Sequence, residues 1–115
     1  MSKRPAALLV EDMLEAIEKI QRYTHELSEP LFLKDQRTAD AVVRNLEIIG
    51  EAASRLPEEL KQKHAHIEWP KIVGLRHRIV HDYFDVDLQL VWHILQKDLL
   101  PLKVSLERLR SSLPK

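Results

Sequence analysis

The chain of 115 residues is long enough for one domain, and its 44% hydrophobic and 31% charged residues are typical of a globular protein. Its formal net charge is zero, so it lacks the basic excess of proteins that bind nucleic acid along an extended track. The absence of cysteine excludes disulfides, thiolate catalysis and thiolate metal sites, and is compatible with a cytoplasmic location. The apolar run at residues 6–10 is too short for a membrane span. We expect a single domain over residues 1–115.

Two long helices are predicted in the first half of the chain. Apolar residues recur at three- and four-residue steps over residues 6–27, and Pro30 then ends the pattern because the residue before a proline resists the α conformation. Residues 31–33 are expected to form a short apolar connector. A second helix, capped by Asp35 or Thr38, should reach residue 56.

The second predicted helix has two apolar faces. Gly50 lies in the middle of the main face, where it costs about 1 kcal/mol against alanine and indicates close approach of a neighbouring helix. A second strip runs along the opposite side through Ala41, Ile48 and Ala52. This pattern predicts a helix that is contacted from two directions, with a second subunit as one candidate for the second contact.

The second half of the chain is also expected to be helical. Pro70 fits the first turn of a third helix over residues 70–83. A fourth helix should cover residues 88–110 after a cap at residues 85–87, with a kink where Pro101 displaces a hydrogen bond. No strand pattern or internal repeat is visible. The predicted fold class is therefore all-α, an antiparallel bundle of four to five helices.

The most informative stretch is Arg76-His77-Arg78-Ile79-Val80-His81-Asp82-Tyr83, at the end of the third predicted helix. At about 100° per residue, Arg76 and Tyr83 fall inside the apolar arc of this helix, whereas Arg78 points elsewhere. His77 and His81 are four residues apart and share an adjoining face. Side chains of these types are suited to holding a phosphate and transferring protons near neutral pH.

Two interpretations of Arg76 stay open at this point. A guanidinium group in a core-facing arc keeps its charge, so it needs an anionic partner or a water-lined opening. In the first interpretation it forms a buried structural ion pair, for which Glu47 and Glu51 on the second helix are the nearest candidates. In the second, Arg76 lines a cleft in the bundle and faces a phosphate.

The two histidines also admit more than one role. A histidine side chain titrates near neutral pH, so the pair His77 and His81 suits general acid–base catalysis. Histidines at this spacing can also hold a metal ion, but neither an HExxH motif nor a clear third ligand accompanies them. We therefore predict no metal and no cofactor. The alternative to catalysis is that His81 and Tyr83 are ordinary structural residues.

At these residues the sequence resembles the HEPN superfamily, and most closely its HepT-like branch. Arg76, the polar His77 and His81 match the superfamily signature of an arginine, a polar residue and, after a short gap, a histidine. Tyr83 matches the tyrosine that this branch carries two residues after the histidine. The sequence departs from the pattern at His77, where asparagine or aspartate is commoner. Three further segments resemble the branch: residues 44–52, 69–83 and 91–102.

The resemblance implies a HEPN-like homodimer that acts as a metal-independent endoribonuclease, with the arginines and histidines of two subunits in one cleft. It further implies a toxin of a type II toxin–antitoxin system. The implied partner is a cognate minimal nucleotidyltransferase antitoxin, bound to the homodimer or within a higher hetero-oligomer, which adenylylates Tyr83 and so blocks the cleft. Arg76 and His81 are then catalytic, and the supporting residues are His77, Arg78, Glu47 and Glu51.

RNA carries its own nucleophile, the ribose 2′-hydroxyl, so the expected chemistry needs no serine, cysteine or metal-bound water. His81 would act as general base or general acid, Arg76 would stabilise charge on the phosphoryl oxygens, and Arg44 or Arg78 would guide the backbone. Two rival hypotheses remain. The chain could be a non-catalytic dimerisation or binding module that partners a nucleotidyltransferase, which the zero net charge mildly favours, or an inert helical adaptor whose polar cluster is structural.

Overall fold

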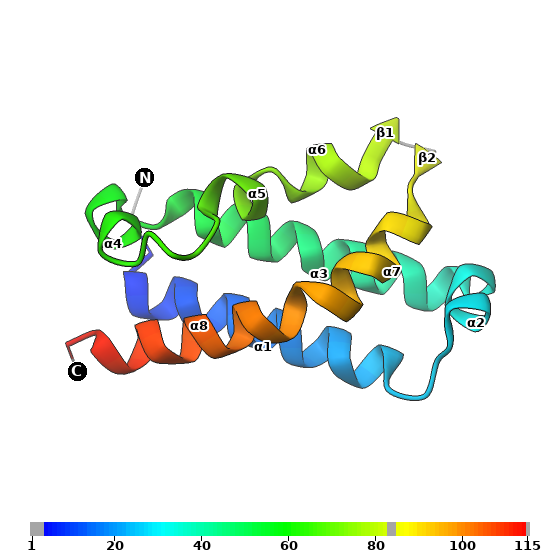
Figure 1. Cartoon of the computed structure of the whole chain (residues 1–115), viewed down its shortest axis with the longest axis horizontal. Helices are drawn as coiled ribbons and strands as arrows, with labels where there is room; N and C mark the ends of the chain where they lie inside the picture. The colour runs from blue at the N-terminus through cyan, green and yellow to red at the C-terminus, as the bar shows by residue number, and fades with distance from the viewer. Residues whose placement is uncertain (1–3, 83–84, 115) are drawn as a thin grey trace.

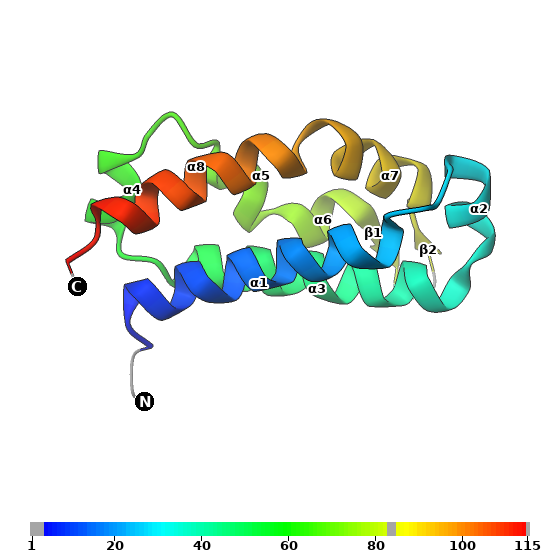
Figure 2. The ribbon, with the colours of Figure 1, turned by 90° about the horizontal axis from the view of Figure 1, so that it is seen from below.

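The computed structural model of the chain describes residues 4–82 and 85–114. Two long helices, α1 (Ala6–Thr24) and α3 (Gln36–Arg55), lie antiparallel and side by side along the molecule (Figures 1 and 2). The last helix, α8 (Leu99–Ser112), packs on α1 and ends near the start of α1 (Figure 1). Five shorter helices complete the bundle: α2 (Glu29–Lys34), α4 (Glu58–Lys63), α5 (Trp69–Val73), α6 (Leu75–Ile79) and α7 (Leu88–Lys97).

The core forms where the apolar stripes of α1, α3 and α8 meet. Burial of these stripes removes apolar side chains from water, which is the main favourable contribution to folding. The fully buried side chains on the three helices include Val10, Met13, Ile17, Ile20, Val42, Ile49, Leu106 and Leu109. The predicted all-α fold class and the first two predicted helices are confirmed.

The second predicted helix, its cap at Asp35 and the close approach at Gly50 are confirmed. The carboxylate of Asp35 caps α3 because it accepts hydrogen bonds from the Thr38 hydroxyl at 2.7 Å and the Thr38 backbone N–H at 3.1 Å. These two bonds, the hydroxyl bond most strongly, lower the pKa of Asp35. A Cβ atom at Gly50 would lie 3.0 Å from the carbonyl oxygen of Ile72, so α5 approaches α3 closely at this glycine, as predicted.

The predicted connector at residues 31–33 is wrong, because these residues belong to α2. The Ser28 side chain accepts a hydrogen bond from the backbone N–H of Leu31 at 3.4 Å and so caps the helix. Pro30 lies in the first turn, where its missing N–H has no intrahelical partner to lose. Phe32 is fully buried and its ring centroid lies 5.3 Å from that of Trp92 on α7. Proline therefore helps to begin a short helix here.

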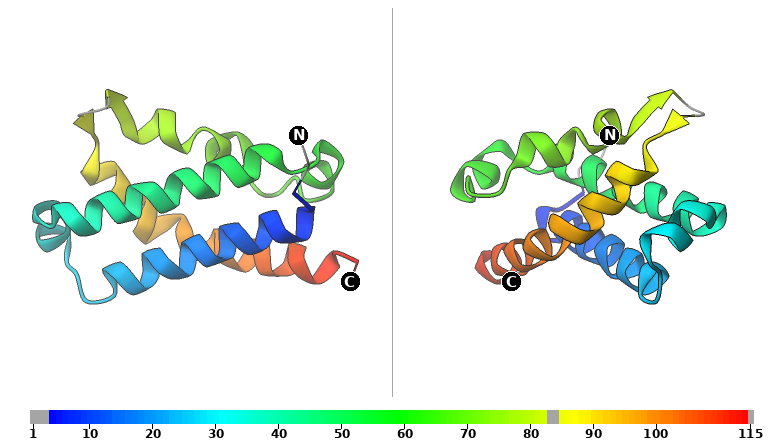
Figure 3. Two further views of the ribbon diagram at one scale, coloured as in Figure 1. Left: turned by 180° about the vertical axis from the view of Figure 1, so that it is seen from behind. Right: turned by 45° about the vertical axis from the view of Figure 1, so that its right-hand side comes forward.

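The predicted third helix is divided into separate pieces. α5 ends at Val73, with Gly74 as its C-cap, α6 covers only five residues, and the chain then extends as β1 (Val80–Asp82). This strand pairs antiparallel with β2 (Asp85–Val86), with Val80 opposite Val86, and the hairpin projects beyond α6 (Figure 3). The β-branched Ile79 and Val80 favour extended backbone over helix at this junction. The predictions of a continuous helix to residue 83 and of a chain without strands are therefore wrong.

The predicted fourth helix is also divided, at Asp98 between α7 and α8. Pro101 has no N–H to donate to the carbonyl of Lys97, whereas the next residue, Leu102, donates its backbone N–H to the carbonyl oxygen of Asp98 at 3.1 Å. The kink is confirmed, although the break lies three residues before the proline. The expected cap is Asp87, which accepts a hydrogen bond from the backbone N–H of Leu90 at 3.0 Å. Over the described residues, no helix has both the length and the apolar character needed to cross a membrane.

Candidate active site

The short helix α6 places Arg76 and His77 against the outer face of α3. Both side chains line a hollow of about 650 Å³ between α3, the α5–α6 segment and the start of α1. The wall formed by α3 is strongly charged, with Arg44, Glu47 and Glu51 exposed to the hollow. This hollow is open to solvent and large enough to receive part of a flexible, charged ligand.

A second hollow of about 380 Å³ lies beside the first, between α3, α6 and the hairpin. Arg44, Glu47 and Arg76 line both hollows, and Val80 and Val86 of the hairpin line only the second. We call the three shared residues the Arg44–Glu47–Arg76 cluster. Two guanidinium groups and one carboxylate thus lie on the boundary between two neighbouring depressions, so the positive excess is confined to this cluster.

Arg76 is exposed, so the prediction that it lies in a core-facing arc is wrong. α6 is only five residues long and buries Leu75 and Ile79. A helix of this length presents one narrow face to the core and leaves its other positions in solvent. The first interpretation of Arg76, a buried ion pair, is therefore excluded, and the side chain lines an open depression instead.

The two proposed carboxylate partners of Arg76, Glu47 and Glu51, have different contacts. Glu51 forms a salt bridge at 3.0 Å with Arg55, one turn further along α3, so its partner is an arginine other than Arg76. Glu47 is half-buried and shares both hollows with Arg76. Among the side chains that the structure describes, none forms a salt bridge with Arg76. The guanidinium is thus available to an external anion.

Arg78 lies on the opposite side of α6, as the helical wheel predicts. It lines a separate pocket of about 370 Å³ between α3, α5–α6 and the α7–α8 junction. Nearby, Lys71 bonds to Glu68 at 2.7 Å, and this bond, with a smaller contribution from the charge of Arg78, lowers the pKa of Glu68. Of the two arginines proposed to guide RNA, only Arg44 therefore lies beside Arg76.

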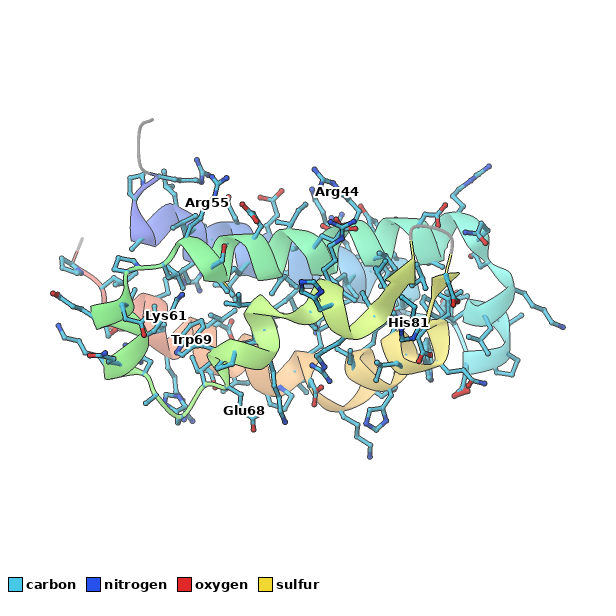
Figure 4. The ribbon with its side chains drawn as sticks, turned by 90° about the horizontal axis from the view of Figure 1, so that it is seen from above. Arg44, Arg55, Lys61, Glu68, Trp69 and His81 are labelled. Atoms are coloured by element: carbon cyan, nitrogen blue, oxygen red, sulfur yellow. The ribbon has the colours of Figure 1, made fainter. Side chains whose placement is uncertain are left out.

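His81 lies on β1 and not on a helix, so the prediction that His77 and His81 share a helical face is wrong. Successive side chains of a strand point to opposite faces, and Val80 already points into the second hollow. His81 instead approaches the start of α7, where its Nε2 atom is 3.9 Å from Oδ2 of Asp87. Figure 4 shows Arg44 and His81 on opposite sides of the α6–β1 ribbon.

Within one chain, the structure thus brings Arg76 together with His77, Glu47 and Arg44, but does not bring His81 into the same hollow. Tyr83 lies outside the described residues. Among those residues, no group of three histidine, aspartate or glutamate side chains is placed to hold a metal ion. The sequence patterns singled out Asp87 only as part of a helix cap, and the contact with His81 arises from a hairpin that they did not predict.

Comparison with known proteins establishes the family. Residues 13–109 match the family model described as "Ribonuclease HepT-like". The chain belongs to the HepT-like ribonuclease family. The resemblance inferred from the residue motifs is thereby confirmed, and with it the assignment to a family of RNA-cleaving enzymes.

Similar proteins occur in archaea and bacteria. The chain is 40% identical over 108 residues to "Probable ribonuclease HepT" of Thermococcus cleftensis, a match that covers 94% of this chain and 98% of that protein. It is 33% identical over 107 residues to a "Putative RNase" of Methanocaldococcus jannaschii, with 93% and 98% coverage. A "Putative RNase" of Caldanaerobacter subterraneus is 36% identical over 90 residues, with 78% and 80% coverage. No solved structure matches the chain.

Proposed function

We propose that this HepT-like chain is a metal-independent endoribonuclease that cleaves RNA by attack of a ribose 2′-hydroxyl on the adjacent phosphate. The observation that carries the proposal is the Arg44–Glu47–Arg76 cluster, in which two exposed arginines line two adjoining hollows. Arginine binds phosphate through paired N–H donors and keeps its charge at any physiological pH. This arrangement favours recognition of a few phosphates at one place, rather than binding along an extended track of nucleic acid. Local recognition of this kind agrees with the zero net charge.

In the proposed reaction His81 takes the proton of the 2′-hydroxyl, and the 2′-oxygen forms a bond to phosphorus. The bond from phosphorus to the 5′-oxygen then breaks, and that oxygen receives a proton from a second acid. Arg76 stabilises the negative charge that develops on the phosphoryl oxygens. The products are a 2′,3′-cyclic phosphate and a 5′-hydroxyl, and every step uses groups of the protein or of RNA itself.

We further propose that a homodimer completes the site. Because Arg76 and His81 lie on different sides of α6–β1 within one chain, a two-fold partner is needed to bring one subunit's histidine to the other's arginine. Two apolar side chains on the wall of the first hollow support an interface there: the half-buried Ile48 and Val73, which is 41% exposed.

We also propose control by a cognate nucleotidyltransferase antitoxin that adenylylates Tyr83, as in a toxin–antitoxin pair. The support is the position of Tyr83 two residues after His81, together with the family assignment. An added adenylate is bulky and anionic, so it would block RNA and compete for the arginines. Mass spectrometry after incubation with ATP and the partner should find adenylate on Tyr83 and not on the exposed Tyr23. Modification of neither tyrosine would refute this part of the proposal.

The nuclease proposal is tested with purified protein, total RNA and a chelator. We expect the wild type to cleave, and His81→Ala to lose about 10²–10⁴-fold in rate while keeping its helical fold. His93→Ala, an exposed histidine on α7, is the matched control and should cleave like the wild type. Cleavage by His81→Ala at the wild-type rate would refute the assignment. RNA binding without cleavage by the wild type would support the non-catalytic module instead.

A further inference from the structure

We infer that Asp87 is a positioning residue for His81, holding the imidazole in the orientation needed for proton transfer. The inference rests on the proposed function, since it assumes that His81 transfers the proton. Asp87 is the single residue between β2 and α7. Three separate contacts join it to α6, to α7 and to His81.

The two oxygens of the Asp87 carboxylate have different partners. Oδ1 accepts the backbone N–H of Leu90 at 3.0 Å and thereby caps α7. Oδ2 faces Nε2 of His81 at 3.9 Å. The cap bond restricts rotation of the carboxylate, so the second oxygen is held in a fixed direction toward the imidazole. A cap alone needs only one oxygen, and serine or asparagine would supply it equally well.

The backbone of Asp87 is fixed as well. Its N–H donates to the carbonyl oxygen of Ile79 at 2.8 Å, and Ile79 is the last residue of α6. Because α6 also carries Arg76 and His77, this bond ties the position of the carboxylate to the helix that presents the arginine. Asp87 therefore links the proton-transfer group to the phosphate-binding group through one backbone bond and one side chain.

The chemistry that follows is that of a histidine paired with a carboxylate. With Nε2–H directed at Asp87, the lone pair of Nδ1 is the site that accepts the proton from RNA. The imidazolium formed in this step is then stabilised by the neighbouring negative charge. The 3.9 Å separation exceeds a hydrogen bond, and catalytic hydrogen bonds commonly shorten when substrate is bound. Both side chains are partly exposed, so solvent screens the interaction and the expected effect is moderate.

Three substitutions separate the cap from the positioning role. Asp87→Ser keeps a capping oxygen but is too short to reach His81. Asp87→Asn keeps the cap through its one carbonyl oxygen, and its uncharged amide N–H, a donor, then faces His81. Asp35→Ser is the matched control, because it exchanges an aspartate that caps another helix and has no contact with the histidine among the described residues. All three variants should remain folded, as judged by thermal unfolding.

We expect kcat to fall about tenfold in Asp87→Ser with KM unchanged, at least as far in Asp87→Asn, whose amide N–H favours the other imidazole tautomer, and not at all in Asp35→Ser. The ³J coupling constants of the His81 side chain, measured by NMR without RNA, should report one dominant χ1 rotamer in the wild type and rotamer averaging in Asp87→Ser. Wild-type couplings and kcat in Asp87→Ser would overturn the inference. If the wild type itself fails to cleave RNA, the proposed function fails, and the couplings alone decide whether Asp87 positions the histidine.

Discussion

The helix pair α1–α3 and the segment from α5 to β2 are built in opposite ways. α1 and α3 are continuous over 19 and 20 residues, and each buries one apolar face along its whole length. In the described part of residues 69–86, by contrast, no element is longer than five residues. The first region supplies most of the core, whereas the second carries the arginine and histidines of the motif.

This difference indicates that stability and chemistry are largely separated in the molecule. Long helices gain free energy from burial along their length, whereas five-residue helices persist only because they pack on a larger neighbour. Short elements also leave side chains such as Arg76 and His81 in solvent, where a ligand can reach them. Variants in the first region should therefore lower the free energy of unfolding, whereas variants in the second region should lower kcat for RNA cleavage.

The largest effect is expected at Arg76. Arg76→Ala should lower kcat for RNA cleavage by about 10²–10³-fold, because it removes a donor that stabilises the phosphoryl charge. Arg78→Ala, two residues away on the other side of α6, should lose far less. Steady-state kinetics on an RNA with a single cut site measures both variants. Equal losses would show that the two sides of α6 do not differ in function.

A core substitution on α1 should show the opposite behaviour. Ile17 is fully buried, so Ile17→Ala should lower the free energy of unfolding by about 2–5 kcal/mol through lost burial and a residual cavity. The kcat of the fraction that remains folded should stay near the wild-type value. Urea unfolding and kinetics at low temperature test both statements. A loss of kcat that exceeds the loss of folded protein would contradict the separation of the two regions.

Gly50→Ala probes the boundary between the regions. The added Cβ would lie 3.0 Å from the Ile72 carbonyl oxygen, so α5 must move. Overpacking of this kind lowers the free energy of unfolding by about 1–3 kcal/mol. The better helix propensity of alanine offsets about 1 kcal/mol of this loss. We expect a net loss of stability, together with a reduced kcat, because α6 follows α5 directly. Ser54→Ala, an exposed position on the same helix, is the control. A more stable and fully active Gly50→Ala would show that α5 adjusts freely.

The smallest expected effect concerns the cap of α3. Hydrogen bonds from Thr38 lower the pKa of Asp35 in the folded chain, so its carboxylate contributes stability above the unfolded pKa, and this contribution is lost as the pH falls through the folded pKa. The stability difference between the wild type and Asp35→Asn should therefore shrink as the pH is lowered below about 4. Thermal unfolding from neutral to acidic pH measures the difference. A difference that is independent of pH would contradict a charged cap.

The sequence predicts the first region well because its signals are local and repeated. Apolar spacing extends over several turns of α1 and α3, Asp35 provides a cap, and Gly50 marks a position where a neighbour approaches closely. Such periodic patterns average over many residues, so single exceptions do not alter the result. The family motif is likewise local, and the comparison with known proteins confirms the family that it indicates.

The second region is predicted poorly because its helices and strands are much shorter than the window of about 11–18 residues over which a helical period is read. The helical wheel that placed Arg76 in the core extends the helix through Val80, which lies in a strand. Once the helix stops at Ile79, the apolar arc is defined by two residues and Arg76 falls outside it. The contact between His81 and Asp87 depends on the return of the chain through the hairpin, which no spacing rule encodes.

The proposal that two chains complete one site is tested most directly by mixing inactive variants. Arg76→Ala and His81→Ala are unfolded together, refolded and assayed for RNA cleavage in chelator. If one subunit's arginine works with the other's histidine, each mixed dimer contains one intact site, and the mixture should recover about a quarter of the wild-type rate. A mixture as inactive as either variant alone would contradict a site shared between protomers.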